Sequence, residues 1–149
     1  MNIKANNKGD ISFAFTFPDL EAERGEIERV ANEFSQDDHN VFVEQFMERA
    51  KGSPLITMEL DMWSMLENTD SYDISPGDWD TVDNHAVAGN PDRPRNWQYF
   101  RLMIENEENL HAPIVCQKNG RLHLVSGNTR LMVARALGKA PQILLVNMD

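Results

Sequence analysis

The 149-residue sequence predicts an α+β fold, and three patterns indicate it. Residues 11–17 alternate large apolar side chains with small ones, as a strand with one buried face does. Residues 114–126 contain two further strand patterns separated by Asn119-Gly120, a dipeptide typical of a two-residue β-hairpin turn. Between these strands, several stretches place apolar residues three and four positions apart, which is the spacing of an amphipathic helix. We expect a single domain over residues 1–149, because a chain of this length builds one modest core.

The N-terminal part, residues 1–68, is predicted to hold the first strand and a helical extension. The apolar side chains of the strand share one face: Ile11, Phe13, Phe15 and Phe17. Pro18 then lies in the first turn of a helix that continues to about Phe34. Asp37 or Asp38 caps a second helix, which ends near Lys51-Gly52.

The next features of this part are aromatic and methionine residues at helical spacing. Phe42 and Phe46 lie four positions apart in the second helix and are expected in the core rather than on a ligand surface. A third helix is expected over residues 57–68, where methionines recur with a tryptophan and a leucine. These methionines are expected to face the core, and an adaptable groove for a partner is the alternative.

Residues 69–95 show no periodic pattern and are predicted to form an acidic loop or lid. Four side chains in this stretch have the chemistry of metal ligands: Asp78, Asp80, Asp83 and His85. Their spacing matches neither a calcium-binding loop nor a zinc site. A flexible acidic lid or linker is therefore favoured over a metal site, although a carboxylate here would suit the Mg²⁺ of a bound nucleotide.

The C-terminal part, residues 96–149, is predicted to begin with a helix that Asn96 caps and that ends near Glu108. The hairpin follows, and at Gly127 the chain turns into a helix over residues 128–137, which Gly138 ends. Residues 141–147 form a last apolar strand. We expect the strands before and after the 128–137 helix to share one sheet, with a parallel arrangement as one option.

The corner Ser126-Gly127-Asn128-Thr129-Arg130 is the predicted binding site for a phosphate group or a nucleotide. A helix N-terminus offers N–H groups without intrahelical acceptors and the positive end of the helix dipole, and both favour an anion. Gly127 lets the backbone approach a ligand closely. Asn128 and Thr129 add side-chain donors, and Arg130 adds a guanidinium that fits phosphate oxygens. The alternative is that Ser126 or Asn128 only caps the helix and that Arg130 is a solvated charge.

The run from Leu124 to Leu131, followed by Ala134-Arg135-Ala136-Leu137-Gly138, resembles the core of the ParB/sulfiredoxin-like superfamily. Members carry a strand, then Gly-x-x-Arg, then an alanine-rich helix, and the resemblance covers residues 110–149. It implies a small ParB/sulfiredoxin-like core of hairpin, glycine corner, helix and strand. It also implies binding of ATP or CTP with Mg²⁺, with NTP hydrolysis or phosphotransfer as the associated activity. A ParB-like nuclease is a further alternative that the superfamily allows.

Two departures from the superfamily pattern bear on this chemistry. Asn128 stands where sulfiredoxins carry a reactive cysteine directly after the glycine, so sulfiredoxin chemistry is not expected. Partitioning proteins show a Gly-Glu-Arg-Arg-like run, and Asn128 and Thr129 replace its glutamate and its first arginine. The resemblance therefore supports binding more than turnover, and no catalytic residue is assigned.

The net charge of −10 is unevenly distributed. Residues 1–95 contain 8 basic and 20 acidic residues, whereas residues 96–149 contain 6 basic and 4 acidic residues. The predicted phosphate corner thus lies in the less acidic part, as an anion site requires. The acidic balance argues against direct DNA binding by this chain alone. It suggests an alternative function, an acidic interaction or inhibitory protein that mimics nucleic acid and binds a basic protein partner.

The remaining sequence features bear on the compartment. Cys116 is the single cysteine, so no internal disulfide is expected, and its apolar surroundings favour a core residue over a reactive thiol. His111 and His123, which flank the hairpin, are expected to be structural. No stretch resembles a membrane span or a signal peptide. We therefore expect no membrane partner and a cytoplasmic location, in a bacterial host if the chain derives from a bacteriophage or another mobile element.

Overall fold

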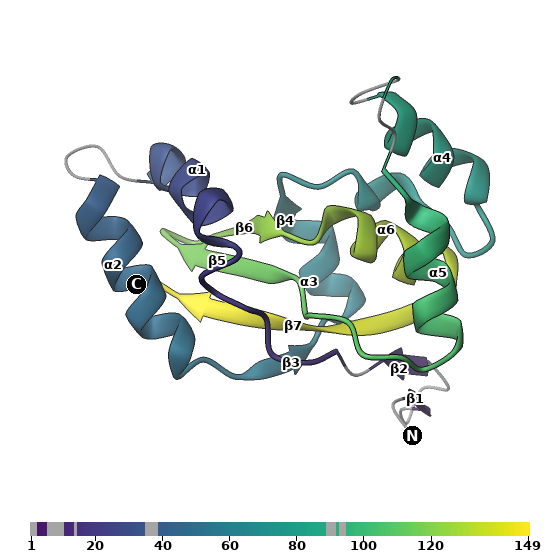
Figure 1. The fold of residues 1–149 in the computed structure, drawn as a ribbon, viewed down its shortest axis with the longest axis horizontal. Coiled ribbons are helices and arrows are strands. Elements are labelled where there is room, and N and C mark those ends of the chain that lie inside the picture. Colours follow the sequence, from purple (N-terminus) through teal and green to yellow (C-terminus); the bar gives the residue numbers. More distant parts are fainter. Residues whose placement is uncertain (1–2, 6–10, 14, 35–38, 89–91, 93–94) are drawn as a thin grey trace.

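The computed structural model describes residues 3–5, 11–13, 15–34, 39–88, 92 and 95–149. These residues form a mixed α+β fold around one sheet of seven strands (Figure 1), which confirms the predicted fold class. Strands from both ends of the chain meet in this sheet. No helix in the described part of the chain is long and apolar enough to cross a membrane.

The regular elements have the following bounds. The strands are β1 (Ile3–Ala5), β2 (Ile11–Phe13), β3 (Leu55–Thr57), β4 (Leu66–Glu67), β5 (Ile114–Lys118), β6 (Arg121–Ser126) and β7 (Lys139–Asn147). The helices are α1 (Arg24–Phe34), α2 (His39–Lys51), α3 (Leu60–Met65), α4 (Trp79–Ala88), α5 (Trp97–Glu105) and α6 (Asn128–Ala136), with a 3₁₀ helix η1 (Ser71–Asp73). The strand order is β1-β2-β7-β5-β6-β4, and β3 also pairs with β7.

Helices cover both faces of the sheet, and the alternation of side chains along the strands decides which face each helix meets. α1 and α2 pack on the face that carries Ile114, Val125 and Leu144. α3 and α6 pack on the opposite face, which carries Val115 and Leu124. α4 and α5 then pack against α6, so that α6 is enclosed between the sheet and these two helices (Figure 1).

Several local predictions are confirmed. Asn119 and Gly120 have φ values of 55° and 76°, as a turn with two left-handed central residues requires. The Asn96 side chain accepts a hydrogen bond from the Tyr99 N–H and caps α5. Cys116 is fully buried, and this burial raises the pKa of its thiol to about 12. Phe42 and Phe46 lie in the core on α2, which ends at Lys51 as expected.

The prediction of an acidic loop over residues 69–95 is wrong, because this stretch contains η1 and α4. α4 has only two buried residues, Val82 and Ala86, so its sequence carries a weak helical pattern. Contacts with α5 stabilise it instead: the rings of Trp79 and Trp97 stack at 5.3 Å, and the indole N–H of Trp97 donates to Asp83 at 2.9 Å.

The predicted third helix over residues 57–68 is also too long. Only residues 60–65 are helical as α3, because β3 and β4 pair with β7 and β6 on either side of it. The first helix begins at Arg24 rather than near Pro18, since residues 20–23 form turns. In both places pairing or turn formation overrides a helical pattern.

The predicted strand over residues 11–17 is shorter than expected. β2 ends at Phe13, and Thr16 forms an isolated parallel bridge with His111. Phe15 is 3% exposed but Phe17 is 42% exposed, so the predicted common face does not extend to Phe17. The side chains of Ile11 and Phe13, and the predicted caps Asp37 and Asp38, lie outside the described residues.

The strands that flank α6 share one sheet, as expected, but they are not neighbours. β5 lies between them and pairs antiparallel with β6 and parallel with β7. β6 and β7 therefore run in opposite directions, which rules out a parallel arrangement of the two. The parallel neighbour of β6 is β4, from a part of the chain where no strand was expected.

Candidate functional site

The predicted glycine corner forms as expected between β6 and α6. Gly127 has φ 102° and ψ 20°, a left-handed conformation, and α6 begins at the next residue. Among the described residues no side chain caps this helix, and its first intrahelical bond runs from the Leu131 N–H to the Gly127 carbonyl at 3.0 Å. The N–H groups of residues 128–130 therefore have no acceptor within the helix and are available to an anion.

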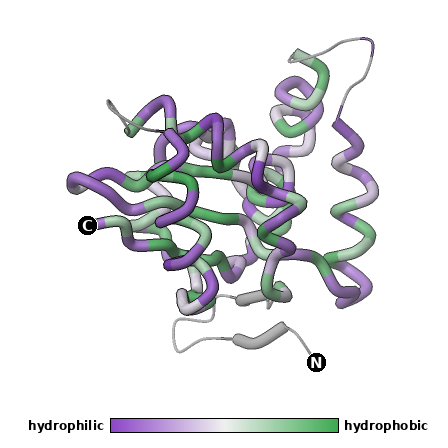
Figure 2. Tube along the Cα trace, turned by 60° about the vertical axis from the view of Figure 1, so that its left-hand side comes forward, coloured by the Kyte–Doolittle hydropathy of each residue, from purple (hydrophilic) through white to green (hydrophobic). Residues whose placement is uncertain are grey.

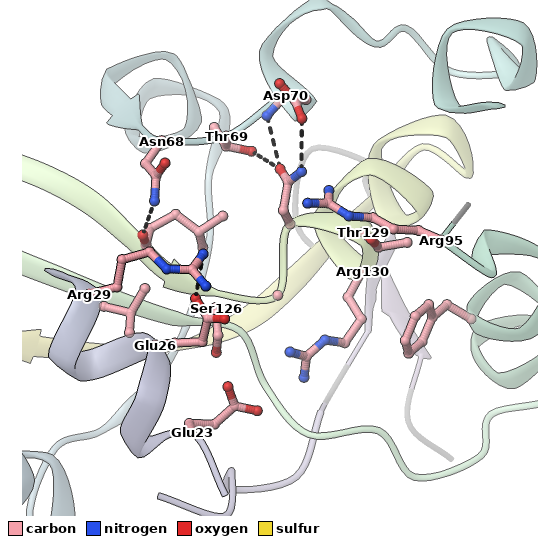
Figure 3. Close-up of a pocket in the computed structure, with 15 residues that line it drawn as sticks. Glu23, Glu26, Arg29, Asn68, Thr69, Asp70, Arg95, Ser126, Thr129 and Arg130 are labelled. Carbon is pink, nitrogen blue, oxygen red and sulfur yellow. Dashed lines mark hydrogen bonds and ion pairs between the residues drawn. The ribbon is translucent and has the colours of Figure 1, made fainter. Parts of the chain in front are cut away.

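A cavity of about 560 Å³ opens in front of this corner (Figure 3). All five predicted site residues line it, so the structure brings them together at one place. Leu124 and Val125, which precede Ser126 on β6, also line it, and the remaining residues come from elsewhere in the chain: Glu23, Glu26, Arg29, Asn68, Thr69, Asp70, Arg95 and Phe100. The residues from elsewhere in the chain were not predicted as site residues, because only the folded chain places them beside Gly127.

Two parallel strands end at the cavity. β4 runs parallel to β6, with Leu66 opposite Leu122, and the segments that follow both strands line the cavity. The carboxyl ends of neighbouring parallel strands are a common place for ligand sites in α/β proteins. Asn68, which follows β4, has φ 62°, and its amide donates to the Leu124 carbonyl at 2.9 Å. This bond ties the two strand ends together.

Asn128 connects the segment after β4 to the start of α6. Its Oδ1 accepts hydrogen bonds from the Thr69 hydroxyl at 2.7 Å and from the Asp70 N–H at 2.9 Å, and its Nδ2 donates to Asp70 at 3.1 Å (Figure 3). The Asn128 amide is thus engaged on both sides. In the structure this side chain positions Asp70, and its role as a donor to a ligand stays a prediction.

Arg130 extends from the first turn of α6 into the cavity (Figure 3). Its Nη1 donates to the His111 carbonyl, which leaves the other guanidinium donors for a ligand. Burial lowers the pKa of Arg130, while the negative charge of Glu23 acts in the opposite direction. A guanidinium stays protonated at neutral pH all the same. Arg130 therefore adds a partly desolvated positive charge to the helix N-terminus.

Arg135, the other arginine of α6, has a different role. Its Nε donates to the Ile74 carbonyl at 2.7 Å, and its guanidinium lies 4.8 Å from the centre of the Trp63 ring. These contacts hold α6 against α3 and the segment after η1, away from the cavity. The two arginines of one helix thus have different surroundings: Arg130 lines the cavity, and Arg135 packs against neighbouring elements.

Ser126 and Thr129 complete the predicted set. The Ser126 hydroxyl is buried and has no hydrogen-bond partner in the described part of the chain. A buried hydroxyl without a partner costs free energy, so such a group calls for an explanation. Thr129 lies one residue into α6 and lines the cavity.

Three carboxylates also line the cavity, and two of them form an ion pair or a hydrogen bond with a neighbouring side chain. Glu26 forms an ion pair with Arg29 at 3.2 Å, and Asp70 accepts from Asn128. Within the described residues the Glu23 side chain has neither a hydrogen bond nor an ion pair, and in Figure 3 its carboxylate points toward Arg130. Arginines and carboxylates therefore occur in equal number around the cavity.

The ligand-type side chains of residues 69–95 do not gather into a metal site. Asp78 accepts from the Thr81 N–H and hydroxyl at the start of α4, and these bonds lower its pKa. His85 contacts Asp73 at 3.1 Å. No group of three or more His, Cys, Asp or Glu side chains suited to a metal occurs over the residues that the structure describes. Of the aspartates in this stretch, Asp70 reaches the cavity.

His123 contributes to packing beside the site. It is 9% exposed, its Nδ1 lies 3.3 Å from Glu67 Oε1, and its ring meets Phe34 edge-on at 5.4 Å. Glu67 and Phe34 also contact Arg121, which donates to Glu67 and lies over the Phe34 ring. This cluster joins β4, β6 and α1, as a structural histidine would.

Comparison with protein-family models, with curated proteins and with solved structures gives no match to this chain.

Proposed function

We propose that this chain binds a phosphate-bearing small molecule, with a nucleotide as the expected class, in the cavity at the Gly127 corner. One observation carries the proposal. The partly desolvated guanidinium of Arg130 has no ion pair within 4.0 Å in the described part of the chain, and it lies beside the uncapped N-terminus of α6. A partly desolvated charge without a close ion pair is unfavourable, and a bound anion would compensate both the guanidinium and the helix N-terminus.

Different residues would bind different parts of the phosphate group. The N–H groups of residues 128–130 would donate to one or two phosphate oxygens, and Arg130 would donate to another. Arg95 extends toward the same cavity as a second cation (Figure 3). Thr129 and Ser126 offer hydroxyls. Asn128 would act on the ligand through the position of Asp70.

The nucleotide class rests on the ParB/sulfiredoxin-like resemblance and on the size of the cavity. A volume of about 560 Å³ falls within the range of roughly 300–1,000 Å³ that small-molecule and cofactor sites occupy. If ATP or CTP binds, we expect the Asp70 carboxylate, which lines the cavity, to hold Mg²⁺ or its water shell. Hydrolysis or phosphotransfer would need a catalytic group, and none is assigned.

Titration calorimetry with inorganic phosphate, ATP, CTP and GTP, each with and without Mg²⁺, tests the proposal. The wild type should bind at least one of them, and Arg130→Ala should weaken that binding about tenfold or more, because charge-assisted hydrogen bonds are lost. Arg49→Ala is the matched control, since this exposed arginine contacts the C-terminal carbonyls outside the cavity. Absence of binding by the wild type, or equal affinity in Arg130→Ala, would refute it.

The uneven charge favours a second candidate, an acidic protein that binds a basic partner. In that case the glycine corner is only part of the scaffold. Salt-sensitive capture of a basic protein that persists in Arg130→Ala would support it. Nuclease activity, the third alternative, would appear as Mg²⁺- or Mn²⁺-dependent cutting of DNA. A cytoplasmic setting in a bacterial host, with a bacteriophage or mobile-element source, stays part of this proposal.

A further inference from the structure

The two walls of the cavity differ in chemistry. One wall offers donors, namely the first turn of α6 and the Arg130 guanidinium. The other carries Glu23, in the turn just before α1, whose carboxylate points across the cavity toward Arg130 (Figure 3). The two groups are close enough for the charge of Glu23 to act on the pKa of Arg130, but they do not form an ion pair.

Glu23 differs from the other carboxylates of the cavity because its side chain forms neither a hydrogen bond nor a close ion pair with any residue that the structure describes. Glu26 is bound to Arg29, and Asp70 is bound to Asn128, whereas no hydrogen bond or ion pair of the Glu23 side chain is found across the described ranges. A ligand that fills the cavity would remove water from this carboxylate. It must then offer Glu23 a donor, or binding would leave a desolvated charge unpaired.

The ligand also needs a body beyond its phosphate group. The cavity is much larger than one phosphate, and its wall includes the Phe100 ring and the Leu124 and Val125 positions. A second phosphate at the Glu23 end would meet a like charge, and an apolar group there would leave the carboxylate without a donor. A hydroxyl would donate a charge-assisted hydrogen bond.

We propose that Glu23 selects a hydroxyl-bearing phosphate ester, such as a sugar, polyol or nucleoside phosphate. The phosphate lies against α6 and Arg130, and a hydroxyl of the ligand donates to the Glu23 carboxylate. This inference rests on the proposed phosphate site, and it adds the residue that recognises the part of the ligand beyond the phosphate. Glu23 acts here as a specificity-determining residue and not as a catalytic one.

Glycerol 1-phosphate and propyl phosphate are a suitable pair of probes, because they differ in two hydroxyl groups and share the chain length and the phosphate. The wild type should bind glycerol 1-phosphate about tenfold more tightly in calorimetry, as expected for one charge-assisted hydrogen bond. Glu23→Ala should remove this preference and retain propyl phosphate binding. Glu28→Ala is the matched control, since Glu28 is exposed on α1 and does not line the cavity.

The outcomes separate this inference from the proposed function. Propyl phosphate binding that depends on Arg130, with no preference for glycerol 1-phosphate, would overturn the role of Glu23 alone. A preference that survives in Glu23→Ala would overturn it as well. If the wild type binds neither ester, the phosphate site itself fails and the inference fails with it. Circular dichroism of each variant verifies the fold, and Glu23→Ala should keep it because no hydrogen bond is lost.

Discussion

Gly127 lies directly against Pro113, with no room for a side chain. A Cβ atom built on Gly127 would lie 2.6 Å from Pro113 Cβ and 2.8 Å from its Cα. Gly127 also has a φ of +102°, which side-chain-bearing residues rarely adopt. The segment before β5 thus sets how closely β6 and α6 meet, and the corner needs glycine for two independent reasons.

Gly127→Ala should therefore lower the free energy of unfolding by about 2–4 kcal/mol, through a clash with a rigid ring and an unfavourable φ. Urea unfolding followed by circular dichroism measures this. Gly120→Ala is the control, because Gly120 has a φ of +76° but nothing within 4 Å of an added Cβ. It should cost only about 1 kcal/mol. Equal losses in the two variants would show that Pro113 does not restrict position 127.

Asn128→Ala should destabilise the protein by about 1–3 kcal/mol, because it leaves the Thr69 hydroxyl and the Asp70 N–H without their acceptor. Asn32→Ala, on an exposed position of α1, should be neutral or slightly stabilising. Thermal and urea unfolding of the two variants provide the comparison. A similar small effect in both would mean that Asn128 does not hold the segment after β4.

Glu67 should make stability depend on acid pH. The hydrogen bond from Arg121 lowers the pKa of Glu67 in the folded state, with a smaller contribution from His123. The resulting stabilisation is present above the unfolded pKa and is lost as the pH falls through the lower, folded pKa. Because Glu67 is partly exposed, we expect Glu67→Gln to cost only about 0.5–1 kcal/mol at neutral pH.

At acid pH, below the lowered folded-state pKa of Glu67, that difference between wild type and Glu67→Gln should shrink toward zero, since the wild-type carboxyl is then largely protonated. Urea unfolding at both pH values checks the sign. A difference that grows on acidification would contradict the assigned cause, as it would require a Glu67 pKa raised by folding.

Cys116 should not react with a thiol reagent in the native protein. Its side chain is fully buried, and the pKa of about 12 keeps the thiol protonated at neutral pH. With Ellman's reagent we expect reaction at the rate of local or global unfolding, and rapid reaction in concentrated urea. Fast modification under native conditions would mean that β5 opens more readily than its central position in the sheet suggests.

The sequence predicted the elements whose signals are local. The dipeptide Asn119-Gly120 alone predicts the tight turn, and Asn96 alone predicts the start of α5. Gly127 and Gly138 mark the two ends of α6. β3, β4 and α4 were missed because contacts distant in sequence create them. The Leu55–Thr57 segment becomes a strand only through β7, and α4 depends on the stacking of Trp79 against Trp97.

The candidate site likewise combines residues that the sequence predicted with residues that only the fold brings together. Residues 126–130 are contiguous, so their chemistry was visible in the sequence, and they do line one cavity. Glu23 reaches the cavity from the turn before α1, Arg95 from the segment before α5 and Phe100 from α5 itself, and nothing near them in the sequence marks them. The segment after β4 carried a faint signal, since Asn68-Thr69-Asp70 is rich in side chains that bond to nearby backbone.

The central place of β7 has a consequence for how this chain acquires its structure. Lys139 pairs with Ile11 and Leu144 pairs with Leu55 and Ile114, so the strand nearest the C-terminus joins partners from the whole length of the chain. Loops of that length close slowly, and a sheet so connected forms late. During synthesis, the earlier strands must wait, with their edges open, until β7 has emerged, and an incomplete chain therefore exposes strand edges that favour aggregation.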